Sequence, residues 1–145
     1  MLERLKFARR LRKASAAAAR VAPLVASSLF PVSSPGGGFD PRLKSDTFVV
    51  GYIYGVTMAF GGDRDRLDKG FLVQQVFEQL FPRQGDAITA YCNAKALEKN
   101  SDFMQATRVG FSETVEMVTS EGAKTLTSLL SHVCEHYMDS GETGG

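Results

Sequence analysis

Apolar residues in the second half of the chain recur at the spacing of amphipathic helices. Between residues 67 and 80 they are separated mostly by three or four positions, and the same spacing returns near the C-terminus. This spacing gathers the apolar side chains on one face of a helix and leaves the opposite face polar. The most regular apolar face is predicted for the last helix and consists of Leu126, Leu129, Leu130, Val133 and Tyr137.

Capping residues, glycines and prolines separate these apolar stretches. Asp46 precedes the apolar segment 47–60 and Ser101 precedes the segment 102–118, and both residue types are favoured at helix starts. The segment 47–60 is rich in β-branched and aromatic residues, but its length favours a buried helix over a strand. Gly110 weakens the prediction for 102–118, because glycine costs about 1 kcal/mol relative to alanine inside a helix. We expect an all-α bundle of about five helices, four to five of them in residues 45–140, at 47–60, 67–80, 86–100, 102–118 and 126–137.

Charge divides the chain into two unlike parts. Residues 1–44 carry nine Lys or Arg and two acids, whereas residues 45–145 carry eight bases and fourteen acids. The run of glycines at 36–38 is typical of a linker. We therefore predict a basic N-terminal arm, partly helical or disordered, at 1–40, an acidic helical domain at 41–140, and a disordered tail at 141–145.

Three interpretations of the arm remain open. Its Arg-rich, acid-poor composition is typical of an organelle transit peptide or another targeting segment. Alternatively it binds an anionic membrane or nucleic acid, or it is a plain solvated helix. No uninterrupted apolar run is long enough to cross a membrane, so we expect no transmembrane segment. The soluble bacterial cytoplasm or an organelle interior is the favoured location, with export as the outcome if residues 1–34 are cleaved. The bases assigned to membrane or nucleic-acid contact are Arg4, Lys6, Arg9, Arg10, Arg12 and Lys13.

Small residues recur every four positions in the segment 47–60, at Gly51, Gly55 and Ala59. They fall on one helix face and allow another backbone to approach closely, either inside the fold or across an interface with a partner. The stretch 51–56 also resembles the glycine-rich first helix of small Tai-type immunity proteins, which are secreted helical proteins that neutralise toxins. The chain lacks the cysteine pattern of that group, so we assign no family.

Both histidines, His132 and His136, lie four positions apart on the last predicted helix. This spacing puts two imidazoles within reach of one divalent metal ion. The sequence around them matches the H-x-x-E-H pattern of inverted zinc proteases, but those enzymes need a third ligand well downstream. A simpler metal site would draw that ligand from Glu113, Glu116 or Asp86. The alternative is a pair of half-buried histidines beside the apolar face, favoured there by the helix dipole.

No catalytic set is visible in the sequence. Cys92 and Cys134 are far apart and lack a CxxC partner, so we expect buried free thiols, with a disulfide only in an exported chain. The carboxylates are scattered singly, and no general acid–base pair is apparent. The leading prediction is a non-catalytic helical interaction protein, an adaptor, inhibitor or accessory subunit that binds a protein partner or itself. The alternatives are a metal- or ligand-binding protein using the two histidines, and a membrane or nucleic-acid binder using the arm.

Overall fold

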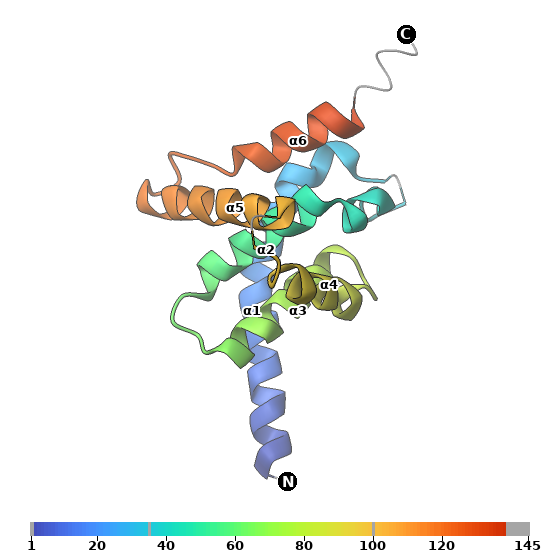
Figure 1. Cartoon of the computed structure of the whole chain (residues 1–145). Coiled ribbons are helices and arrows are strands. Elements are labelled where there is room, and N and C mark those ends of the chain that lie inside the picture. Colours follow the sequence, from blue (N-terminus) through green and yellow to red (C-terminus); the bar gives the residue numbers. More distant parts are fainter. Residues whose placement is uncertain (1, 35, 100, 139–145) are drawn as a thin grey trace.

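The computed structural model of the chain describes residues 2–34, 36–99 and 101–138. Over these ranges the fold is all-α and contains no β-strand, only an isolated bridge between Ser33 and Phe39 (Figure 1). The predicted fold class is therefore confirmed. The helices are α1 (Leu2–Leu29), η1 (Phe30–Val32), η2 (Pro41–Ser45), α2 (Thr47–Gly61), α3 (Arg66–Leu80), α4 (Gly85–Lys95), α5 (Asp102–Thr119) and α6 (Thr127–Tyr137).

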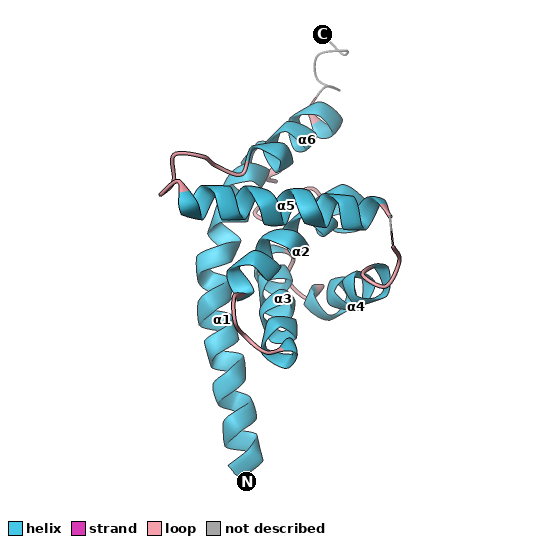
Figure 2. Ribbon diagram, turned by 60° about the vertical axis from the view of Figure 1, so that its left-hand side comes forward, coloured by secondary structure: helices cyan, strands magenta, loops and turns pink. Residues whose placement is uncertain are grey.

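Helix α2 lies at the centre of the molecule. It contacts all five other α-helices, and α5 and α6 lie across the end of the molecule opposite the N-terminus (Figure 2). Its sequence is apolar on every side, which is the pattern of a buried helix rather than of a surface helix. Val49, Val50, Ile53 and Val56 are accordingly completely buried, and so is Tyr52. The helix predicted at 47–60, where a strand was the alternative, is thus confirmed.

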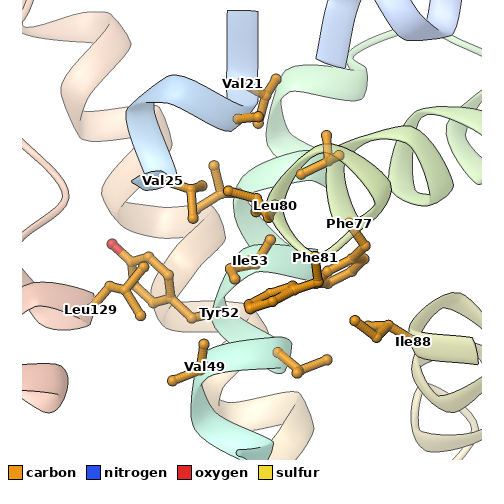
Figure 3. Close-up of a cluster of buried hydrophobic side chains, with 14 of the residues drawn as sticks. Val21, Val25, Val49, Tyr52, Ile53, Phe77, Leu80, Phe81, Ile88 and Leu129 are labelled. Carbon is orange, nitrogen blue, oxygen red and sulfur yellow. The ribbon is translucent and has the colours of Figure 1, made fainter. Parts of the chain in front are cut away.

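One hydrophobic core joins residues from the whole chain. Val21 and Val25 of α1 lie over Ile53 of α2, with Phe77 of α3 and Leu129 of α6 on the flanks (Figure 3). All five residues are at most 2% exposed. Because α1 and α6 share this core, residues near both ends of the chain stabilise it together.

Helix α1 changes character along its length. Its first turns project beyond the other helices, whereas its second half buries Ala18, Val21, Ala22, Val25 and Leu29 (Figure 1). The first half still contacts α3, where the rings of Phe7 and Phe71 meet edge to face at 5.4 Å. The basic segment that we expected to be an arm is thus helical, and its second half is core. Whether residues 1–40 have a separate task remains a prediction.

By length and composition alone, one described segment could cross a membrane. It is Leu2–Val32, whose most apolar stretch has a mean hydropathy of 1.3. This stretch can include isolated charged residues, whereas the uninterrupted apolar run considered above cannot. Buried core helices and N-terminal export signals pass the same test, and 39% of this stretch is buried in the fold. The expected absence of a transmembrane segment stays a prediction.

The glycine-rich segment after α1 forms a hydrogen-bonded turn. Asp40 N–H donates to the Val32 carbonyl at 2.9 Å, and Ser34 N–H donates to the Gly38 carbonyl at 2.9 Å. Gly37 and Gly38 have φ angles of 98° and 76°, which only glycine adopts without strain. The turn returns the chain to the core, where Leu43 is completely buried. The tail that we expected to be disordered, 141–145, lies outside the described residues.

Helix boundaries follow the capping residues. Asp46 accepts a hydrogen bond from Val49 N–H at the start of α2, and Ser101 accepts one from Met104 N–H at the start of α5. Both predicted starts are confirmed. The third predicted helix, expected to run to about residue 100, corresponds to α4 and ends earlier, at Lys95.

Candidate functional site

The two histidines belong to a polar cluster between α6 and the start of α2. His132 Nε2 lies 2.9 Å from Asp46 Oδ2, and Tyr137 Oη donates to the same oxygen at 2.7 Å. The His132 ring stacks on Phe48 with ring centres 4.4 Å apart. The side chains of His132 and Asp46 are only 17% and 16% exposed. The cluster is therefore a half-buried link between the two helices.

Asp46 is the residue that organises this cluster. Burial alone would raise the pKa of its carboxyl, but hydrogen bonds from His132, Tyr137 and the Val49 N–H outweigh burial and hold the pKa below its ordinary value. A carboxylate only accepts hydrogen bonds, so His132 Nε2 carries the proton and donates it.

This geometry bears on the metal-site hypothesis. The rings of His132 and His136 are near one another, with centres 4.4 Å apart. Among the residues that the structure describes, no group of three or more His, Cys, Asp or Glu side chains is placed to hold a metal ion. Of the third ligands considered, Glu113 binds Tyr52, Glu116 lies 3.8 Å from Lys124, and Asp86 accepts from Gln74. A metal at the histidine pair therefore stays a prediction.

A second polar cluster joins α2, α5 and the start of α6 through Glu113. Its Oε1 accepts from Tyr52 Oη at 2.6 Å and from Ser128 N–H at 3.1 Å, and its Oε2 accepts from the Ser128 hydroxyl. Helix α6 has no side-chain cap of its own at Leu126. Glu113 of α5 supplies that cap, and its negative charge interacts favourably with the positive N-terminal end of the α6 dipole. Burial of Tyr52 raises the pKa of its phenol, and the adjacent Glu113 carboxylate raises that pKa further.

Both clusters attach α6 to the rest of the fold. Asp46 binds its last turns and Glu113 binds its first turn. Each carboxylate accepts hydrogen bonds from several donors, as partly buried carboxylates require. The arrangement stabilises a helix junction. The sequence indicated Asp46 only as a helix cap and Glu113 only as a candidate metal ligand.

The small-residue face of α2 packs against α5 of the same chain. A Cβ at Gly51 would lie 2.7 Å from the Phe103 carbonyl oxygen, and one at Gly55 would overlap the Thr107 carbonyl. Gly110, on α5, lies as closely against the Tyr52 carbonyl. Gly51 and Gly55 are buried and Ala59 is half-buried. Of the two alternatives, close approach inside the fold is the one present at Gly51 and Gly55, and α5 occupies the face that was also considered as an interface.

The two cysteines differ in environment. Both are free thiols; Cys92 is completely buried, whereas Cys134 is exposed on α6. Burial raises the pKa of the Cys92 thiol to about 12, so it stays protonated at neutral pH. The prediction of buried thiols is right for Cys92 and wrong for Cys134, which lies on the outer side of the last helix.

The basic residues assigned to the arm lie on the first half of α1. Lys6, Arg9, Arg10 and Lys13 line one hollow of about 700 Å³ beside the loop between α2 and α3. Arg4 and Arg12 do not line it. The chain thus brings four of the six predicted residues together and leaves two outside.

Comparison of the chain with models of known protein families, with curated protein sequences and with solved structures finds no match.

Proposed function

We propose that this chain is a non-catalytic helical interaction protein that works by protein–protein recognition, as an adaptor, inhibitor or accessory subunit. The single observation that carries the proposal is an exposed apolar stripe on α5. The stripe consists of Phe111, Val115 and Val118, which are 45%, 44% and 58% exposed. Their spacing of four and three residues aligns them along one helix face.

None of these three side chains belongs to the hydrophobic core that the described residues form. The inward face of α5 is formed by Phe103, Ala106, Gly110 and Thr114, all buried. The outward stripe is a second apolar face on a helix at the edge of the bundle, where polar residues are expected. Two of its three residues are valines, which are poorer helix formers than most polar residues. An apolar face that neither helix propensity nor the core explains is typical of a contact surface.

The occupant that fits this stripe is a second copy of the chain. Two α5 helices packed antiparallel would set Phe111 of each copy against Val115 of the other. The same arrangement brings Arg108 to the C-terminal end of the opposite helix, near Glu121, where the helix dipole is negative. Arg108 forms no ion pair with any described residue of its own chain. Apolar and charged positions are thus complementary in a two-fold pair.

Analytical ultracentrifugation over a concentration series tests the proposal. Six half-exposed side chains contribute about 1 kcal/mol each, so we expect a dissociation constant of about 40 µM. We expect Phe111→Ser to abolish the dimer and Leu97→Ser to leave it unchanged, since Leu97 is 83% exposed and lies just after α4, outside the stripe on α5. A chain that stays monomeric well above that concentration, or equal effects of the two substitutions, would refute self-association through α5.

A further inference from the structure

A basic hollow lies between the first half of α1 and the loop that leads into α3. It encloses about 700 Å³, within the range of small-molecule sites. One wall is α1, and the other is the segment around Arg64, far away in the sequence. Alanines of α1 also line the hollow, and their short side chains take up little of its space. The charged lining residues are Lys6, Arg9, Arg10, Lys13, Arg20, Arg64 and Asp68.

The charge in this hollow is largely unbalanced. Arg10 lies 3.5 Å from Asp65 and 3.6 Å from Asp68, so its charge is compensated. The other five bases form no ion pair with any residue that the structure describes. Like charges at neighbouring helix positions repel one another, so this clustering opposes helix stability. A bound anion would remove that repulsion.

Arg64 distinguishes the hollow from a plain basic helix face. Its Nη1 donates to the carbonyls of Phe60 at 3.1 Å and Gly61 at 3.2 Å, which holds the guanidinium at the end of α2. Arg64 thus lines the hollow from the end of α2, together with the basic residues of α1. A targeting segment or a solvated helix needs no basic residue on the opposite wall.

We propose that this hollow binds a multiply charged phosphate group, either of a soluble phosphorylated molecule or of a phospholipid headgroup. Four of its bases are arginines, whose planar guanidinium groups bind phosphate oxygens in pairs. Its volume suits a compact ligand rather than a duplex. The fourteen acids against eight bases in residues 45–145 would repel a long nucleic acid.

Binding of inorganic triphosphate to the full chain, measured by isothermal titration calorimetry, tests the soluble source. Co-sedimentation with phosphatidylcholine vesicles, with and without phosphatidic acid, whose phosphomonoester can carry two charges, tests the headgroup. We expect Arg9→Gln and Arg64→Gln each to weaken binding about tenfold, the effect of one charge-assisted contact. Arg12→Gln is the matched control, because it removes the same charge from the same helix outside the hollow.

The pattern across the variants decides the outcome. Binding that is weakened by Arg9→Gln and Arg64→Gln and kept by Arg12→Gln establishes the site, and the probe that binds identifies the source. Equal losses for Arg12→Gln and Arg9→Gln would mean that only total charge matters, which overturns the proposal. Absence of binding to both probes overturns it as well. Circular dichroism confirms that each variant is folded, and Arg9→Gln carries the test if Arg64→Gln loosens the end of α2.

Discussion

Replacing Gly55 by alanine tests whether the backbone contact between α2 and α5 determines the packing of the fold. In an open helix this substitution stabilises by about 1 kcal/mol, because alanine loses less backbone entropy. At Gly55 the new Cβ would overlap the Thr107 carbonyl and would lie 3.0 Å from Phe111 N. These are backbone atoms, so no side-chain rotation can relieve the overlap. Helix α5 must move away as a unit.

The magnitude follows from what that movement disturbs. Overpacking a dense core costs about 1–3 kcal/mol. Moving α5 also weakens the hydrogen bond from Thr107 Oγ1 to the Gly51 carbonyl, now 3.1 Å, and loosens the contacts of Phe103. Together these losses exceed the gain in helix propensity. We expect Gly55→Ala to lower the free energy of unfolding by about 3 kcal/mol.

Urea denaturation followed by far-UV circular dichroism measures this difference, with Gly70→Ala as the matched control. Gly70 lies inside α3, and a Cβ there would meet nothing within 4 Å. The same chemical change should therefore stabilise the protein at Gly70, by up to about 1 kcal/mol. Opposite signs for the two substitutions are the expected result. A Gly55→Ala protein as stable as the wild type would show that α5 does not pack against α2 as described.

Three further predictions concern polar groups and thiols. Because hydrogen bonds lower the pKa of Asp46 in the folded state, its stabilising contribution should be complete above about pH 5 and be lost as the pH falls through that pKa. The difference in unfolding free energy between wild type and Asp46→Asn should therefore shrink in acid, and a pH-independent difference would contradict this. Glu113→Ala leaves the buried Tyr52 hydroxyl without its acceptor and should cost about 2–4 kcal/mol in urea denaturation, more than Tyr52→Phe. Iodoacetamide at pH 8 should label only Cys134 in the folded protein, because burial raises the pKa of Cys92 to about 12. Mass spectrometry should find Cys92 labelled only after unfolding, and two labels on the folded protein would contradict the burial of Cys92.

The helices could be predicted because their signals are local. Caps such as Asp46 and Ser101 are followed at once by apolar residues with helical spacing, and every helix after residue 45 begins close to its predicted start. Gly110 shows the limit of local evidence. It weakened the helix prediction, yet it lies inside α5 because the Tyr52 carbonyl of α2 occupies the space where a side chain would be.

The polar clusters could not be predicted, because their members are far apart in the sequence. Asp46 and His132 are separated by 86 positions, and Tyr52 and Glu113 by 61. The histidine spacing correctly indicated one helix face but could not show that a carboxylate already binds one ring. Likewise, the basic residues of α1 could not indicate that Arg64 lies on the opposite wall of the hollow.

The contact between α1 and α6 sets the order in which this chain can fold. The Ser28 hydroxyl bonds to the Leu126 carbonyl across 98 positions, and Leu129 and Val133 share the core with Val25. During synthesis the second half of α1 emerges early and can pack against α3, but α6, which also covers it, arrives only after α5 is complete. Until then the part of α1 that α6 covers remains accessible to chaperones, export factors or a membrane. The apolar half of α1 is therefore fully covered only after α6 has been synthesised.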